Sequence, residues 1–217
     1  MNMVSERTMV KVWIRIFLAA GLALGTAAAA AEPVAGVGLG DSLMAGYQLG
    51  PGEAFPEKLQ AALAAEGFDV TIANAGVSGD TTAGGLARLE WSVPDGTDFV
   101  ILELGANDAL RGIAPEITRA NLQEMIDRLR ARGIDVILAG MLAPPNMGDD
   151  YAARFDPIYP ELAERNGLPL YGFFLDGVIT QDALMLADGM HPNAAGVDRM
   201  VEKFMPVMRA YLSSRAD

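Results

Sequence analysis

Residues 34–43 read Val-Ala-Gly-Val-Gly-Leu-Gly-Asp-Ser-Leu, and this stretch decides the fold class. An apolar run ends there in a polar, glycine-containing turn. Similar apolar runs follow at 70–73, 99–104 and 136–139, with a shorter candidate at 168–171. Strands that are apolar along their whole length are typical of parallel sheets, which are buried on both faces. We therefore interpret these five runs as the strands of one parallel sheet.

The segments between the expected strands have the spacing of helices. In residues 115–132, for example, apolar side chains recur at steps of three and four. We expect helices at 54–66, 81–90, 115–132, 152–166 and 194–211. Alternating strands and helices predict a three-layer α/β/α sandwich with a central, mainly parallel five-stranded sheet, flavodoxin-like in kind. Chemistry in such a sheet belongs to the loops that follow the carboxyl ends of the strands.

The N-terminus has a composition unlike that of the rest of the chain. Basic residues at Arg7, Lys11 and Arg15 precede an apolar run at 16–24 and a run of alanines that ends at Ala31. This three-part pattern predicts a signal peptide at 1–31, followed by one folded domain at 32–217. The alternative is an uncleaved anchor, because the apolar run approaches spanning length. We expect cleavage, no stable membrane insertion afterwards, and a periplasmic or secreted protein.

Composition excludes several classes of site. The 16 basic and 28 acidic residues give a formal net charge of −12, which disfavours binding to nucleic acid. Cysteine is absent and His191 is the single histidine, so disulfides, thiolate metal sites and multi-histidine metal sites are impossible. We therefore expect no metal and no other cofactor. The sequence carries no signal for an oligomeric state.

Polar residues that could take part in a reaction follow the expected strands. Ser42 follows the first strand, Gly79 lies in the turn 74–80 after the second, and Asn107 lies in the turn 105–108 after the third. Near the C-terminus, Asp188 precedes His191 by three residues, so the carboxylate can accept a hydrogen bond from one imidazole nitrogen while the other acts as a base. Taken singly, each has an ordinary reading: a helix N-cap serine, two turns and a structural histidine.

Together, and in this order, the four motifs resemble the SGNH, or GDSL, hydrolase family. They are Gly-Asp-Ser-Leu at 40–43, Asn-Ala-Gly-Val-Ser-Gly-Asp at 74–80, Gly-Ala-Asn-Asp at 105–108 and Asp-Gly-Met-His-Pro at 188–192. Further stretches at 39–47, 78–81, 85–89 and 102–112 are similar to the bacterial periplasmic enzymes of the family that act as thioesterase, protease and lysophospholipase, and that are often described as arylesterases.

The resemblance implies a role for each block. Ser42 would be the nucleophile, His191 the base and then the acid, and Asp188 the carboxylate that orients the imidazole. The Ser42 N–H, the Gly79 N–H and the Asn107 amide would form the oxyanion hole. The substrate would be a small acyl ester, a thioester or a lipid, hydrolysed through an acyl-enzyme.

Other acidic residues near these blocks fit structural roles. We expect them to cap helices or order loops, and we assign none of them to catalysis: Asp41, Asp80, Glu103 and Asp108. The apolar loop at 141–148 contains Pro144 and Pro145, which would either contact the acyl group or simply pack as a crossover.

Two rival folds fail on their motifs. The dinucleotide pattern Gly-x-Gly-x-x-Gly ends on Asp41 when it starts at Gly36, and the Gly-x-Ser-x-Gly elbow has Met44 where it requires glycine. Two alternatives of function stay open within the predicted fold. One is a carbohydrate acetyl esterase, and the other is a non-catalytic protein that binds a lipid or a sugar.

Overall fold

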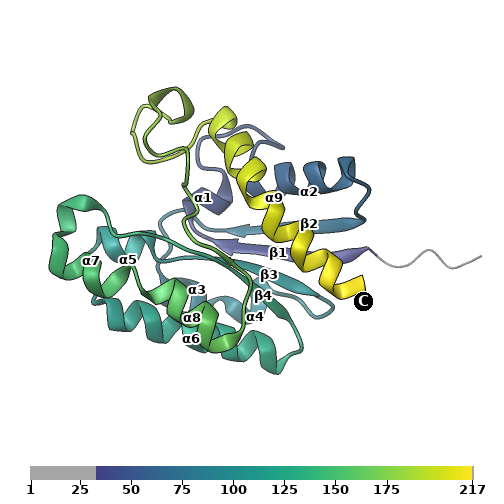
Figure 1. Cartoon of the computed structure of the whole chain (residues 1–217), viewed down its shortest axis with the longest axis horizontal. Helices are drawn as coiled ribbons and strands as arrows, with labels where there is room; N and C mark the ends of the chain where they lie inside the picture. The colour runs from purple at the N-terminus through teal and green to yellow at the C-terminus, as the bar shows by residue number, and fades with distance from the viewer. Residues whose placement is uncertain (1–32, 217) are drawn as a thin grey trace, which may run out of the picture. The chain divides into compact units, whose positions relative to one another are not determined.

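The central sheet of the protein is parallel throughout. The computed structural model describes residues 33–216, so the predicted signal peptide lies outside the described residues and the domain division stays a prediction. The strand order is β2-β1-β3-β4-β5, with every neighbouring pair parallel (Figure 1). The strands span Val34–Gly40 (β1), Val70–Gly76 (β2), Phe99–Glu103 (β3), Asp135–Ala139 (β4) and Leu170–Tyr171 (β5). The predicted five-stranded parallel sheet is confirmed.

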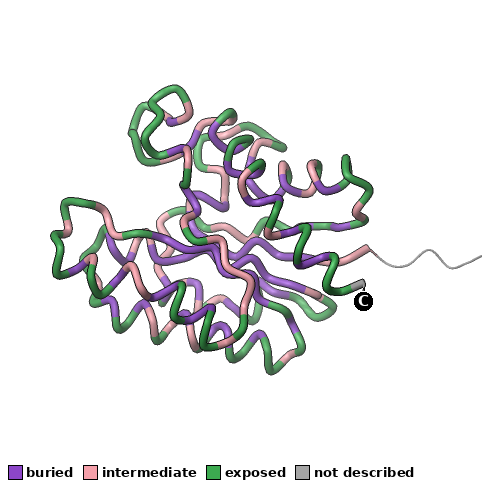
Figure 2. The backbone as a smooth tube through the Cα atoms, viewed as in Figure 1, coloured by how far each residue is buried: buried purple, intermediate pink, exposed green. Residues whose placement is uncertain are grey.

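The inner strands supply the centre of the core. Figure 2 shows their backbone coloured as buried, between helices that are partly exposed. All five residues of β3 are buried. Beside it, Gly36 of β1 lies over the ring of Phe99, and a Cβ at this position would overlap the ring. Glycine in β1 therefore serves close packing between neighbouring strands.

Helices cover both faces of the sheet, which gives the predicted three layers (Figure 1). One face carries α1 (Ser42–Ala45), α2 (Phe55–Ala65) and α9 (Ala194–Ala216). The other carries α3 (Thr82–Ala87), α4 (Leu89–Ser92), α5 (Ala106–Leu110), α6 (Pro115–Ala131), α7 (Asp149–Phe155) and α8 (Ile158–Asn166). Short 3-10 turns lie at Pro145–Met147 and Asp182–Leu184. No helix among the described residues combines the length and the apolar character needed to span a membrane.

Two predicted helices were wrong as single elements. The helix expected at 81–90 is interrupted at Arg88, which has φ −103° and ψ 4° and directs its side chain toward the sheet. The helix expected at 152–166 is divided between Phe155 and Ile158. Pro157 lies at that division, and proline has no N–H to continue a helical hydrogen-bond ladder. The fifth strand is also shorter than the four residues expected.

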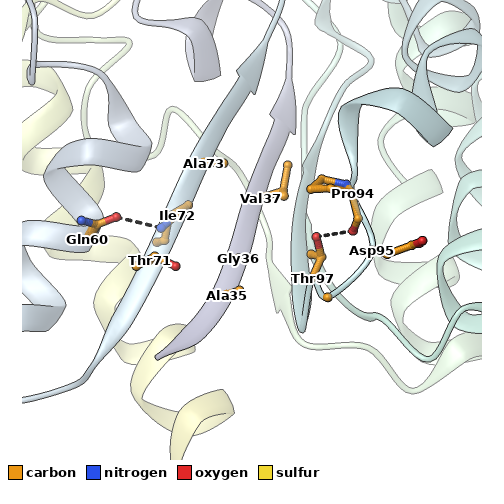
Figure 3. A pocket seen from close by; sticks show the side chains of 11 residues that line it. Ala35, Gly36, Val37, Gln60, Thr71, Ile72, Ala73, Pro94, Asp95 and Thr97 are labelled. Atoms are coloured by element: carbon orange, nitrogen blue, oxygen red, sulfur yellow. Dashed lines mark hydrogen bonds between the residues drawn. The ribbon is translucent and has the colours of Figure 1, made fainter. Parts of the chain in front are cut away.

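The structure contains a pocket away from the carboxyl edge of the sheet. It is lined by the first halves of β1 and β2, by Gln60 of α2 and by the loop 94–97, as Figure 3 shows. The Gln60 side chain accepts a hydrogen bond from Ile72 N at 2.8 Å, which satisfies a backbone donor of the edge strand β2. The five residues with a predicted catalytic or oxyanion role do not line this pocket: Ser42, Gly79, Asn107, Asp188 and His191. Ser42 and Asn107 lie at the other end of the strands, just after the carboxyl ends of β1 and β3.

Candidate active site

Ser42 begins the helix that follows β1. Asp41, not Ser42, is the N-cap of α1, since its Oδ1 accepts a hydrogen bond from Leu43 N at 3.0 Å. The N-cap interpretation of Ser42 is therefore wrong. Because the capping is done by its neighbour, the Ser42 hydroxyl is available for a different partner.

That partner is His191, which is 149 residues away in the sequence. The distance between His191 Nε2 and Ser42 Oγ is 2.8 Å. On the other side of the ring, His191 Nδ1 lies 2.7 Å from Asp188 Oδ2. With the proton on Nδ1 facing the carboxylate, Nε2 is left as the acceptor for the serine hydroxyl.

Asp188 is held in its ionised form by the turn that carries it. Its Oδ1 accepts backbone hydrogen bonds from Met190 N at 2.9 Å and His191 N at 3.0 Å. These two bonds, followed by the one from the His191 ring, lower the pKa of Asp188 from 3.8 to about 2. The three-residue spacing thus lets one carboxylate fix both the backbone of the turn and the imidazole.

The loop that carries His191 is fastened to the start of α9. His191 O accepts a hydrogen bond from Leu186 N at 2.7 Å, and Met185 pairs with Pro192 in a β-bridge. The Asn193 side chain donates to the carbonyls of Ala183 and Met185. The position of the imidazole is consequently determined by several bonds beyond those of the ring itself.

Asn107 lies in α5, directly after β3. Its Nδ2 donates a hydrogen bond to Asp41 Oδ2 at 3.0 Å, which joins the third block to the first. A side-chain amide nitrogen carries two hydrogens, so one remains for another acceptor. Asp41 therefore sets the direction in which Asn107 presents its remaining N–H.

Gly79 lies in the loop between β2 and α3. It has φ +81°, a backbone conformation that favours glycine. Its carbonyl accepts a hydrogen bond from Arg111 Nη2 at 2.6 Å. Within the described part of the chain, neither the Ser42 N–H nor the Gly79 N–H donates to an acceptor. Both backbone donors are thus available at the edge where Ser42 lies.

Two carboxyl groups are completely buried behind Ser42. Burial raises the pKa of Asp41 to about 6, although the bonds from Leu43 and Asn107 act in the opposite direction. Glu103, the last residue of β3, accepts a hydrogen bond from Asp41 N at 3.2 Å. Burial, and then the charge of Asp41, raises the pKa of Glu103 well above its ordinary value. Both effects favour the neutral form of the Glu103 carboxyl group.

The remaining two acidic residues bond as structural groups. Asp108 accepts hydrogen bonds from Thr82 N and from the hydroxyls of Thr82 and Thr118, and so links α3, α5 and α6. Asp80 pairs with Arg88 at 2.7 Å. Bonds of this kind order loops and helix ends, as expected from the sequence. No group of acidic or histidine side chains among the described residues could hold a metal ion.

The proline loop combines packed and exposed parts. Met141 is buried and Ala143 N donates to Asp156 Oδ1 at 2.8 Å, which ties the loop to the end of α7. Pro144 is half-buried and Pro145 is exposed at the start of a 3-10 turn. Both interpretations of this loop therefore keep some support, because Met141 and Met147 pack against the core while Leu142 and Pro145 are exposed.

Sequence patterns gave Tyr47 no role, but the structure brings it to His191. The centroids of the two rings are 4.4 Å apart and the rings are tilted by 38°. Tyr47 is 38% exposed, so it covers one side of the imidazole while it faces solvent. The only signal in the sequence was that Tyr47 ends the stretch 39–47, which resembles the family.

Comparison with known proteins gives relatives over most of the chain. Residues 39–199 match the model of the GDSL-like lipase/acylhydrolase family. Arylesterase of Vibrio mimicus is 46% identical over 71% of this chain and 78% of its own. Esterase TesA of Pseudomonas aeruginosa is 40% identical over 88% and 94%. Thioesterase 1/protease 1/lysophospholipase L1 of Escherichia coli K12 is 34% identical over 78% and 83%.

Solved structures agree with the sequence comparison. The crystal structure of AlinE4, an SGNH-hydrolase family esterase, is 43% identical and superposes with a TM-score of 0.71 over 85% of this chain and 99% of that one. The strand order, the four motifs in sequence and this extent of similarity lead to one conclusion: the chain belongs to the GDSL-like lipase/acylhydrolase family.

Proposed function

We propose that the protein is a serine esterase that hydrolyses carboxylic esters and thioesters through an acyl-enzyme on Ser42. A single observation carries the proposal: the hydrogen-bonded series from Ser42 Oγ through both His191 ring nitrogens to Asp188 Oδ2, with lengths of 2.8 Å and 2.7 Å. A serine hydroxyl is a weak nucleophile and needs an adjacent base, which in turn needs an orienting group. This series supplies both.

In the first half of the reaction, Ser42 Oγ attacks the carbonyl carbon of the substrate. His191 Nε2 takes the hydroxyl proton as the new C–O bond forms. The ionised Asp188 accepts the Nδ1 hydrogen bond and stabilises the imidazolium. Collapse of the tetrahedral intermediate breaks the bond to the leaving alcohol or thiol, which receives the proton from His191 Nε2.

In the second half, a water molecule attacks the acyl group on Ser42 and gives its proton to His191. The Ser42 Oγ–acyl bond breaks, the carboxylic acid leaves, and the proton returns to Ser42 Oγ. Negative charge develops on the carbonyl oxygen in both halves. The Ser42 N–H, the Gly79 N–H and the second Nδ2 hydrogen of Asn107 are the donors that would stabilise it.

The relatives support the substrate class. Their names include an arylesterase, an esterase and a thioesterase with lysophospholipase activity, which indicates small acyl esters, thioesters or lipids. These names do not favour the alternatives of a carbohydrate acetyl esterase or a non-catalytic binding protein. The accessible loop from Pro144 to Gly148, which includes Pro145, is our candidate for a wall that contacts the acyl group.

We also propose that the leader at 1–31 is cleaved and that the mature enzyme acts in the periplasm or outside the cell. The basic, apolar and alanine-rich parts of the leader support export. N-terminal sequencing of the protein recovered from cell fractions tests this. A start near Glu32 is expected, and a start at Met1 in the membrane fraction would contradict it.

The catalytic assignment is tested on Ser42. Ser42→Ala removes the nucleophile and little else, so hydrolysis of a chromogenic short-chain ester should fall by at least about 10³-fold while the melting temperature is kept. A fluorophosphonate probe should label Ser42 in the wild type. Ser213→Ala, on the exposed side of α9, is the matched control and should keep both activity and labelling. Substantial activity in Ser42→Ala would refute the assignment.

A further inference from the structure

The segment Gly84–Leu89 has no part in the mechanism above, although part of it resembles the family. Arg88 lies in this segment, between α3 and α4, and only 11% of its side chain is exposed. The guanidinium donates four hydrogen bonds: to Asp80 Oδ2 at 2.7 Å, to Ala75 O at 2.8 Å, to Gly40 O at 2.9 Å and to Ser92 Oγ at 3.0 Å. A buried cation with this many partners connects several parts of the structure.

Three of the acceptors lie next to proposed catalytic groups. Gly40 is the last residue of β1 and precedes Ser42 by two residues. Ala75 lies near the end of β2, the strand that leads to the loop of Gly79. Asp80 directly follows Gly79. One planar group thus joins the strand of the nucleophile to the loop that carries a proposed oxyanion donor.

Helix α3 is shaped to allow this approach. A Cβ at Gly84 would overlap Asp80 Oδ1, and a Cβ at Gly85 would overlap the side chain of Leu104, which follows β3. Two adjacent glycines lower the intrinsic stability of a helix. Their presence in a six-residue helix indicates that α3 must lie close to this edge of the sheet, which brings Arg88 within reach of its acceptors.

A second arginine contacts the same loop from another element. Arg111, directly after α5, donates to the Gly79 carbonyl. The Gly79 loop is therefore bonded on one side through Gly79 O and on the other through the Asp80 carboxylate. Arg111 is exposed and makes this single bond to the loop, whereas Arg88 is nearly buried and joins the loop to both strands.

We propose that Arg88 is a positioning residue for the esterase reaction, which fixes the Gly79 N–H relative to Ser42 by joining the ends of β1 and β2 to Asp80. The inference rests on the proposed function. An oxyanion donor acts on charge that exists in the transition state, so its displacement lowers kcat more than it raises KM. A displacement of about 1 Å can cost on the order of 10²-fold in rate.

The main test is Arg88→Lys, with kcat measured per active site titrated by a fluorophosphonate. Lysine keeps the positive charge but has no planar fork to reach four separated acceptors. We expect kcat per titrated site to fall roughly 10- to 100-fold with KM changed less than about threefold. In Arg88→Ala, added guanidinium ions should restore part of the lost kcat.

The matched control is Arg132→Lys. The Arg132 side chain is 22% exposed and donates to Val93 O at 2.7 Å, with Glu90 and Asp95 nearby, but it contacts no proposed catalytic loop. This variant should lower the melting temperature and leave kcat per titrated site unchanged. If the Arg88 variants do not fold, Asp80→Asn carries the test, because it removes the ion pair while the backbone bonds of Arg88 stay. It should lower kcat per site with little change in KM.

The outcomes separate this inference from the function on which it rests. Unchanged kcat per titrated site in Arg88→Lys or Asp80→Asn, with wild-type activity that depends on Ser42, would overturn the inference and leave the proposed function intact. Hydrolysis at the wild-type rate by the Ser42→Ala variant would overturn both the inference and the proposed function. A fall in kcat per site, with partial recovery by guanidinium in Arg88→Ala, supports a positioning role, because a role in stability alone would change the number of titrated sites instead.

Discussion

Carboxyl groups lie at both ends of the central strands, but they differ between the two ends in burial and in pairing with a cation. At the amino-terminal end, Asp98 precedes β3 and Asp135 begins β4, and Arg215 of α9 donates to both, at 2.8 Å and 2.7 Å. The other Asp98 oxygen accepts from Ala35 N at 2.8 Å, and Tyr211 OH donates to Asp135 at 3.0 Å. These acids are partly exposed and paired with a cation.

At the carboxyl-terminal end, two acids behind Ser42 are buried and lack such a partner. Asp41 and Glu103 are fully inaccessible, and among the described residues neither forms an ion pair. Glu103 Oε1 has no hydrogen-bond partner within residues 33–216. An unpaired buried charge opposes folding, so Asp41 in its ionised form destabilises the folded state, whereas Asp98 and Asp135 are paired with Arg215. We infer that Asp41 serves the proposed orientation of Asn107 through the hydrogen bond that it accepts from Asn107 Nδ2, at a cost in stability.

Among the variants that test this comparison, Asn107→Ala at the carboxyl end should have the largest effect, a fall in kcat. The oxyanion would lose one donor, so kcat should fall by roughly 10²–10³-fold with little change in KM. Titrated kcat and melting temperature are measured on the same preparation. A destabilised variant with normal turnover per titrated site would show instead that Asn107 only orders the turn after β3.

Asp41→Asn should separate activity from stability. Asparagine still caps α1, but its amide cannot accept from Asn107 without a flip, so kcat should fall roughly 10- to 100-fold. The pKa of Asp41 is raised in the folded protein, so its stabilising protonation is complete below pH 3.8 and is lost as the pH rises through about 6. The variant should therefore gain stability over the wild type at pH 8, by about 1–3 kcal/mol, and lose that advantage at pH 4.

Urea unfolding at the two pH values measures this difference. The mature wild type is the reference. Below pH 3.8 both proteins should lose stability as other carboxylates become protonated, so the comparison is made at pH 4 and above. That fall includes Asp188, whose lowered pKa makes its contribution present above 3.8 and lost as the pH falls toward about 2. An Asp41→Asn variant that is destabilised equally at pH 4 and pH 8 would contradict a raised pKa for Asp41.

Arg215→Met tests the amino-terminal end. It removes the cation shared by Asp98 and Asp135 but keeps much of the apolar side chain. Because these groups are about one-third exposed or more, solvent screens the pairs, and we expect a loss of only about 0.5–1 kcal/mol in unfolding free energy. Ester hydrolysis per titrated site should not change. A clear fall in kcat would mean that the two ends of the sheet are coupled.

Glu103→Gln should have the smallest effect. A protonated carboxyl and an amide have nearly the same shape, and the amide oxygen can still accept from Asp41 N. We expect a change below about 1 kcal/mol that does not vary between pH 5 and pH 8. A strong pH dependence of this difference, followed by urea unfolding, would show that Glu103 is ionised in the folded protein.

Sequence patterns predicted the strands and the order of the motifs because these are local properties. A fully apolar run such as 99–102 has one favourable environment, the middle of a sheet covered on both faces. The break at Arg88 could not be predicted in the same way, because the apolar spacing continues across it. The Arg88 side chain donates hydrogen bonds to carbonyls at the ends of β1 and β2. A local sequence pattern contains no information about these distant acceptors.

By itself, the sequence determined the fold class, the family and the residues that could do chemistry, since these follow from periodicity and from motifs a few residues long. Tertiary structure alone decided which side chains meet. The 2.8 Å between Ser42 Oγ and His191 Nε2 depends on how α9 packs against α2, because this packing places the loop before α9 beside Ser42. The assignment of the N-cap to Asp41 leaves the Ser42 hydroxyl available. Contacts between residues 149 positions apart arise from packing of the whole sheet and its helices, so no short stretch of sequence encodes them.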